Sequence, residues 1–182
     1  MGQALGMIEL ISVPAGIEAG DAMLKAAAVE LVTAQAACAG KYFVAVTGEV
    51  AAVEASVKAG REAASMKLID SLVIPNIDAQ VPLAINMCSD PGEIETLGAI
   101  ETFSLCAAIV AADCAVKAAR VRLIEIRLGR GLGGKSFITL TGDVAAVKAA
   151  VKAASEVEEV RGLMAESVVI PSPHPDMVKA VF

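Results

Sequence analysis

The segment Leu5-Gly6-Met7-Ile8-Glu9 decides the fold, because it returns further on as Leu97-Gly98-Ala99-Ile100-Glu101. Three more segments return in the same order: Asp21–Lys25 as Asp113–Lys117, Thr47–Val53 as Thr141–Val147, and Ser71–Pro75 as Ser167–Pro171. The offset between the copies grows from 92 to 94 to 96 residues, so the second copy holds two short insertions. A repeat of this length is too long for a solenoid unit and matches a small domain. The sequence therefore predicts a tandem of two similar domains.

Each copy has the pattern of a βαββαβ domain. In the first copy, apolar or β-branched runs predict strands over 4–13, 29–35, 42–47 and 68–74, and helical spacing predicts one helix over 16–28 and another beginning after Gly48-Glu49. This order predicts an α+β fold of two tandem ferredoxin-like domains, each an antiparallel sheet with helices on one face. The expected boundaries are 3–80 for the first domain, 81–95 for a linker and 96–182 for the second domain. The stretch 76–95 carries Pro82, Pro91 and Gly92, which we interpret as breakers of regular structure.

Composition narrows the class of protein. The chain has 182 residues, 56% of them hydrophobic but only 3% aromatic, and a formal net charge of −6. An acidic chain without a clustered basic face argues against a nucleic-acid partner. No uncharged apolar run is long enough to cross a membrane, and Glu9 and Glu18 interrupt any signal-like leader, so we expect a cytosolic protein. High apolar content without a membrane segment predicts extensive contacts between subunits.

One segment, Gly129-Arg130-Gly131-Leu132-Gly133-Gly134-Lys135-Ser136, matches the phosphate-binding pattern GxxxxGK[ST]. In a phosphate-binding loop the glycine turn leads into a helix, whose N-terminal amides hold the phosphate. Here Phe137–Thr141 alternates and is β-branched, which predicts a strand. We therefore interpret the segment as a loop between strands, with a nucleotide-binding enzyme as the less favoured alternative.

The titratable residues show no catalytic pair. His174, the one histidine of the chain, lies between two prolines, and Glu9 and Glu101 occupy equivalent strand positions, where a repeated structural contact explains them better than catalysis. Cys106 and Cys114 fall on a predicted helix among alanines, and Cys88 lies in the linker. Cys38 stands in a turn of small residues. It is either an idle thiol or one of three ligands gathered around a threefold axis, since one thiolate cannot hold a metal cluster alone.

Taken together, the repeated motifs resemble the bacterial microcompartment (BMC) shell domain. They are LGMIE, DAMLKAA, GK, VTGEVAAVEA and VIP, which return as LGAIE, DCAVKAA, GGK, LTGDVAAVKA and VIPSPH. The likeness covers nearly the whole chain apart from the linker and indicates the tandem-domain type. It implies a structural protein, not an enzyme, placed in the shell of a microcompartment in the cytoplasm.

The resemblance also implies an assembly and a site. A homotrimer would present six domains as a pseudohexameric tile, packed against other shell proteins. Its central pore would be lined by Cys38, Ala39 and Gly40 in the first copy and by Leu132, Gly133 and Gly134 in the second. Lys25 and Lys117 match the lysine at which tiles meet edge to edge.

In similar chains, a cysteine at the position of Cys38 is associated with an iron–sulfur cluster, here expected as [4Fe–4S] shared by three subunits. Such a cluster would transfer electrons, with redox enzymes of the lumen as partners, or the pore would gate small molecules. The alternative function that we keep open is a regulatory protein with tandem ferredoxin-like modules that binds a small molecule between domains.

Overall fold

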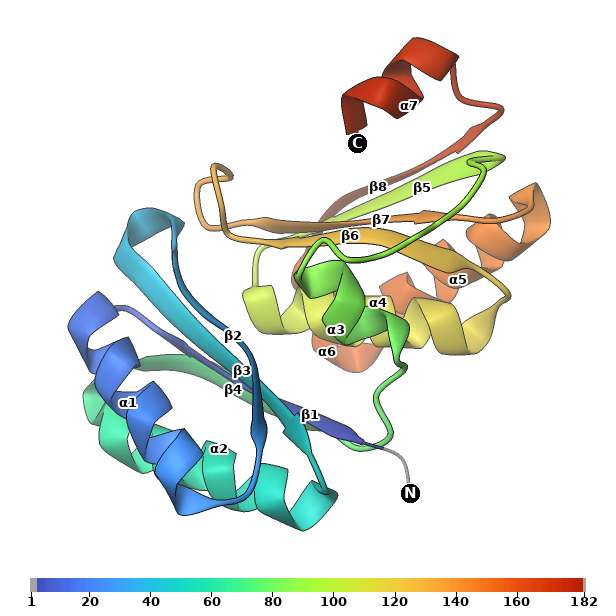
Figure 1. The fold of residues 1–182 in the computed structure, drawn as a ribbon. Coiled ribbons are helices and arrows are strands. Elements are labelled where there is room, and N and C mark those ends of the chain that lie inside the picture. Colours follow the sequence, from blue (N-terminus) through green and yellow to red (C-terminus); the bar gives the residue numbers. More distant parts are fainter. Residues whose placement is uncertain (1–2, 182) are drawn as a thin grey trace. The chain divides into compact units, whose positions relative to one another are not determined.

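The computed structural model describes residues 3–181, which divide into two compact units. Unit 1 consists of the described residues up to Ile77 together with Gly129–Gly134. Unit 2 consists of Asp78–Leu128 and the described residues from Lys135 onward. Each copy of the sequence repeat builds one four-stranded sheet (Figure 1). The βαββαβ prediction is confirmed for both copies.

Unit 1 follows the predicted order. Its elements are β1 (Ala4–Leu10), α1 (Val13–Ala26), β2 (Glu30–Ala37), β3 (Lys41–Gly48), α2 (Val50–Ala64) and β4 (Leu68–Ile74), with single 3₁₀ turns at Cys38–Gly40 and Ser65–Lys67. The strands pair antiparallel in the order β2-β3-β1-β4, and α1 and α2 cover one face of this sheet (Figure 1). Helix α1 begins at Val13, before the predicted Gly16. Pro14 in the first turn explains the earlier start, because its fixed φ suits that position.

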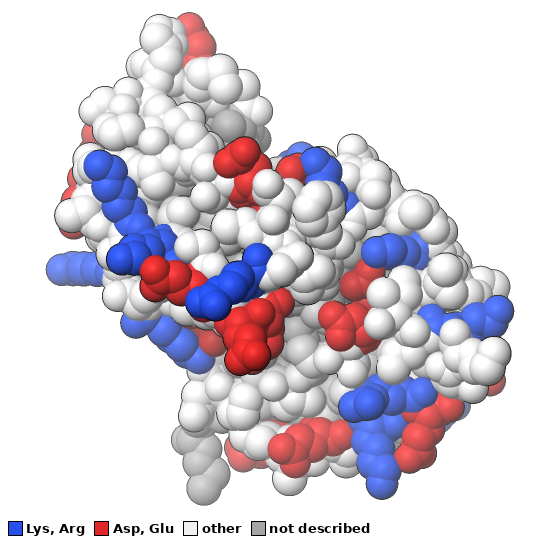
Figure 2. Space-filling model, turned by 180° about the vertical axis from the view of Figure 1, so that it is seen from behind, with Lys and Arg blue, Asp and Glu red and all other residues white. Residues whose placement is uncertain are grey.

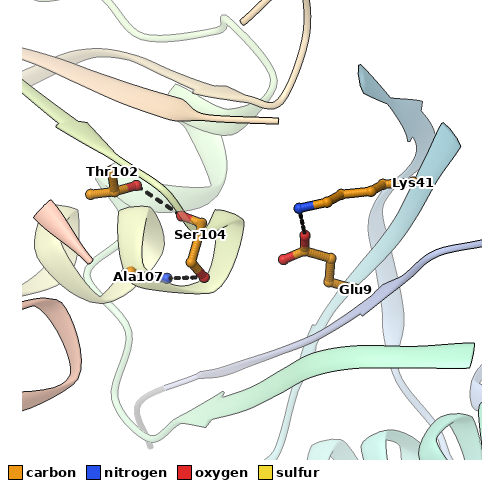
Figure 3. Close-up of polar contacts among 5 residues, drawn as sticks. All are labelled: Glu9, Lys41, Thr102, Ser104 and Ala107. Atoms are coloured by element: carbon orange, nitrogen blue, oxygen red, sulfur yellow. Dashed lines mark hydrogen bonds and ion pairs between the residues drawn. The ribbon is translucent and has the colours of Figure 1, made fainter. Parts of the chain in front are cut away.

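Unit 2 repeats this plan. Its elements are α3 (Gln80–Ile85), β5 (Thr96–Thr102), α4 (Leu105–Ala118), β6 (Arg122–Leu128), β7 (Ser136–Thr141), α5 (Val144–Glu156), α6 (Glu158–Arg161), β8 (Met164–Pro171) and α7 (Pro175–Val181). The sheet order is β6-β7-β5-β8, and α4 and α5 lie on one of its faces (Figure 1). Ser104 is the N-cap of α4, and its hydroxyl accepts a hydrogen bond of 3.2 Å from the Ala107 N–H (Figure 3). The Thr102 hydroxyl in turn donates to the Ser104 carbonyl.

Helix α3 was not predicted. We interpreted 76–95 as an irregular linker because of its prolines, yet Gln80–Ile85 is helical. Pro82 lies in the first turn of this helix, where its missing N–H has no intrahelical partner to lose. Val81, Ala84 and Ile85 are buried, since α3 packs on β6 and α4. Tertiary packing therefore makes a helix of a segment whose local sequence signals a loop.

The core of unit 1 is thin and closely packed. Ile8 and Val44 of the sheet pack with Met23 of α1 and Val53 and Val57 of α2, all of them buried. Gly6 of β1 makes the close approach possible. A Cβ added at this position would lie 2.5 Å from a methyl group of Val57 and 2.6 Å from one of Val53. Gly98 is its repeat equivalent, and a Cβ added there would lie 2.8 Å from a methyl group of Leu140 and 2.8 Å from one of Val147.

We predict that Gly6→Ala destabilises the protein by about 1–3 kcal/mol, because the added methyl group pushes helix α2 away from the sheet. Urea unfolding of the variant and the parent protein measures this loss. Gly162→Ala is the matched control: nothing lies within 4 Å of its added Cβ, so we expect a change within about 0.5 kcal/mol. Equal effects of the two substitutions would contradict this account of the packing.

Candidate functional site

The turn between β2 and β3 carries Cys38, and the structure brings it next to the glycine-rich segment Gly129–Gly134 within unit 1. The Cys38 N–H donates to the Gly129 carbonyl at 2.7 Å, and the Gly131 N–H donates to the Cys38 Sγ at 2.9 Å. These two loops are the ones predicted to line the pore. Their proximity in the chain's own unit is a finding of the structure, whereas a pore requires several chains and stays a prediction.

Several residues of both loops have a left-handed backbone conformation. This conformation orients their N–H groups differently from those of a strand or helix. Ala39 has φ +62°, and Gly131, Gly133 and Gly134 have φ +70°, +62° and +90°. Glycine adopts this region without steric cost, whereas alanine does so only at a cost. Successive N–H groups in such a conformation form a concave surface that favours negative charge. The glycines that suggested a phosphate loop therefore serve a different group, the thiol of Cys38.

These N–H groups lower the pKa of the Cys38 thiol from its ordinary value. The N–H of Leu132 has the largest effect, and those of Gly131, Gly133 and Gly134 add to it, while desolvation opposes them. Hydrogen bonds to sulfur stabilise the thiolate, the form that binds metals. For Cys114 on α4 the pKa moves in the other direction, because burial raises it and the neighbouring Asp113 carboxylate raises it further. Local sequence around the two thiols does not rank their pKa values, because the N–H donors to Cys38 come from a distant segment, with Gly131 93 positions away.

The described part of one chain does not hold a complete metal site. Among residues 3–181, no three or more His, Cys, Asp or Glu side chains come together in a way that could hold a metal ion. Cys106 and Cys114 lie on α4, and Cys88 follows α3. Cys38 contributes one thiol per chain.

Directly after each loop in the sequence, a lysine forms an ion pair with a glutamate of a strand. Lys41 contacts Glu9 at 2.7 Å (Figure 3), and Lys135 contacts Glu101 at 2.7 Å. The two pairs are equivalent in the repeat but differ in burial: the side chain of Glu9 is 1% exposed and that of Glu101 is 30% exposed. The repeated glutamates therefore have a structural contact, as their repetition suggested, and the pairs tie the start of β3 and of β7 to the central strand.

The remaining motifs have simple environments. Strand β7 begins at Ser136, so no helix follows the glycine-rich segment and the phosphate-loop alternative is excluded on geometry. Lys25 pairs with Asp21 and Lys117 with Asp113, each at 2.5 Å over one helical turn. On the face shown in Figure 2, acidic and basic side chains lie beside one another and form no continuous basic area. Within residues 3–181, no helix has both the length and the apolar content needed to cross a bilayer.

Comparison with known proteins identifies the class. The model of the BMC domain matches twice, over residues 4–77 and 96–173. The chain therefore belongs to the BMC-domain family of bacterial microcompartment shell proteins, and the resemblance drawn from its motifs is confirmed. The shell proteins of this family are structural, so the alternative of a regulatory protein is set aside.

Individual relatives refine this assignment. The chain is 43% identical to the microcompartment shell protein PduT of Citrobacter freundii over 177 residues, which cover 97% of this chain and 96% of that protein. It is 44% identical to the shell protein EutM of Salmonella typhimurium over 85 residues, 46% of this chain and 85% of that protein. A crystal structure of a microcompartment protein from Desulfitobacterium hafniense superimposes with a TM-score of 0.93 at 48% identity and covers 99% of both chains. The tandem arrangement is thus shared along the full length with PduT, whereas EutM corresponds to one repeat.

We predict that Cys38 of the reduced, metal-free protein is alkylated at lower pH than Cys114. Because the pKa of Cys38 is lowered and that of Cys114 is raised, the thiolate of Cys38 forms first as the pH increases. Iodoacetamide labelling over a pH series, followed by peptide mass spectrometry, gives a midpoint for each thiol. A midpoint for Cys38 at or above that of Cys114 would contradict the proposed effect of the loop N–H groups.

We predict that Lys41→Met costs about 3–5 kcal/mol, because it leaves the buried Glu9 carboxylate without its counter-ion. The equivalent Lys135→Met should cost about 1 kcal/mol or less, since Glu101 is reached by water. Urea unfolding of both variants tests the difference. The double variant Glu9→Gln with Lys41→Met should regain most of the loss, and a failure to do so would show that the lysine acts through packing instead of charge.

Proposed function

We propose that this shell protein forms a trimeric tile, in which three Cys38 thiolates meet around a central pore and hold an iron–sulfur cluster. The single observation that carries this proposal is the Cys38 thiol with backbone N–H groups directed at it. The match to EutM covers 85 residues, about the length of one repeat. Three tandem chains would supply six domains, and therefore the shape of a hexagonal tile.

The residues fit the cofactor. A cluster of four irons binds thiolates and takes up hydrogen bonds from N–H groups to its sulfur atoms, which tune its potential. Cys38 is only partly buried, carries such a donor at 2.9 Å and has its pKa lowered. Three chains would supply three of the usual four cysteine ligands and leave one iron position open to a small molecule. When bound, the cluster would supply one-electron transfer.

The loops also fit the role of a pore lining. Gly40, Gly131 and Gly133 have nothing within 4 Å of an added Cβ, so their backbone faces open space in the single chain. Ala39 and the glycines project almost no side chain, and Cys38 and Leu132 are the bulkier groups. In the proposed tile the two loops would alternate around the axis. With the cluster in place the pore would be closed, and passage of electrons would replace passage of metabolites.

The lysines fit the edge of such a tile. The side chain of Lys25 is 75% exposed and that of Lys117 is 44% exposed, and they lie in the last turns of α1 and α4, respectively. We propose that they meet neighbouring shell proteins. Other microcompartment shell proteins are the partners of this edge, and redox enzymes of the lumen are the partners of the cluster.

We expect protein prepared anaerobically with iron and sulfide to be coloured, with iron and sulfide in the ratio of one cluster to three chains. Cys38→Ser should remove the visible absorption and leave the trimer intact, whereas Cys88→Ser and Cys114→Ser should keep both. Absorption spectroscopy, metal analysis and sedimentation measure these properties. A colourless parent protein that sediments as a trimer would reject the cluster and keep the tile. A monomeric protein would reject the tile.

A further inference from the structure

The end of each sequence repeat leaves its sheet in the same conformation. A proline, Pro75 or Pro171, stands at the end of the last strand of each repeat. The residue after it has a left-handed backbone in both copies, with φ +52° at Asn76 and φ +49° at Ser172. A short helix follows in both, α3 in one case and α7 in the other. The turn into each helix is also the same: the Asp78 carboxylate accepts from the Gln80 N–H at 2.9 Å, and the His174 Nδ1 accepts from the Asp176 N–H at 3.2 Å.

The two helices also share their apolar pattern. With the offset of 96 residues that relates Pro75 to Pro171, Val81 corresponds to Met177 and Ala84 to Ala180. In α3 these apolar positions are buried, whereas in α7 Met177 is 57% exposed. The outward position of α3, Leu83, is half exposed and corresponds to Lys179. Helix α7 therefore has the apolar face of α3 without the contacts that bury it.

The surface that receives α3 is formed by α4 and β6. Ile109 and Leu123 of these elements are buried. Two hydrogen bonds fix the incoming segment: the Asp78 N–H donates to the Asp113 carboxylate at 2.9 Å, and the Leu123 N–H donates to the Gln80 side chain at 3.0 Å.

The equivalent surface of the first repeat is open. Ile17 and Leu31, the counterparts of Ile109 and Leu123, are 58% and 49% exposed, and Leu24 beside them is 41% exposed. They line a hollow of about 220 Å³ between α1, β2 and β3. Asp21, the counterpart of Asp113, lies on its wall. The first repeat thus has the same residue types as the second at these positions and lacks the helix that covers them.

We propose that helix α7 of one chain docks into this α1–β2 groove of a second chain, as α3 docks on α4 and β6. The apolar side chain of Met177 would fill the place of Val81. The backbone N–H of His174, the counterpart of the Asp78 N–H, would donate to the Asp21 carboxylate. Asp176, the counterpart of Gln80, would accept from the Leu31 N–H. Such a head-to-tail contact uses two different surfaces and closes into a ring when the rotation between copies allows it. The inference refines the proposed tile and rests on its ring assembly.

Photocrosslinking tests the contact directly. Heavy-nitrogen-labelled and unlabelled chains are co-assembled, with a benzophenone amino acid in place of Met177 in one of the two populations. We expect crosslinks to residues 17–31 of the other population, and few from the same probe at Lys179, which faces away in the proposed contact. Crosslinks confined to the chain that carries the probe, or to another surface, would overturn the docking.

Substitution gives a second, independent readout. Met177→Glu should raise the protein concentration at which the ring dissociates by at least about tenfold, the effect of losing one anchoring apolar contact in each interface. Lys179→Glu changes the charge by more and should leave this concentration unchanged. If the ring forms and Met177→Glu dissociates no more readily than the parent protein, the docking is wrong and the tile stands. If the parent protein is a monomer at all concentrations, both proposals fall.

Discussion

The close approach of helix to sheet at Gly6 and Gly98 is the constraint on which the rest of the structure depends. With no Cβ at Gly6, the side chains of Val53 and Val57 pack directly on β1. With no Cβ at Gly98, those of Leu140 and Val147 pack directly on β5. The domain can then be built from alanine and valine with few aromatics, and its layers are thin. The same central strand, β1 or β5, carries the glutamate that holds the lysine after each loop. The position of the loops therefore follows from the packing of the core.

Most strands and helices of the two domains could be predicted from the sequence, because each pattern occurs twice and one copy supports the interpretation of the other. The segments around Leu5 and Leu97 have the same apolar pattern, and both form central strands. Strand β4 was predicted with its observed bounds, Leu68–Ile74, since Pro75 ends it. Helix α3 escaped prediction because Val81, Ala84 and Ile85 become helical through contact with β6 and α4, residues far from them in the chain.

The site shows the same division between local and distant signals. The small residues around Cys38 predicted a tight turn, and the structure places a left-handed Ala39 there. The N–H groups that lower the pKa of the thiol come from Gly131 to Gly134, and no local pattern around Cys38 indicates them. The same glycines matched a phosphate-binding motif in the sequence. Only the strand that follows them separates the two interpretations, since hydrogen-bond donors of the same kind suit a phosphate and a thiolate alike.

Joining the two domains in one polypeptide has a consequence for how the loops diverged. The first loop bears a thiol and the second bears glycine donors, and each chain carries one of each. If separate genes encoded the two domains, changes in expression would alter the ratio of the two loops. Covalent linkage fixes the ratio at every level of synthesis. Mutations in one loop can then be selected for their effect on the other, as in a heteromer whose subunits never dissociate.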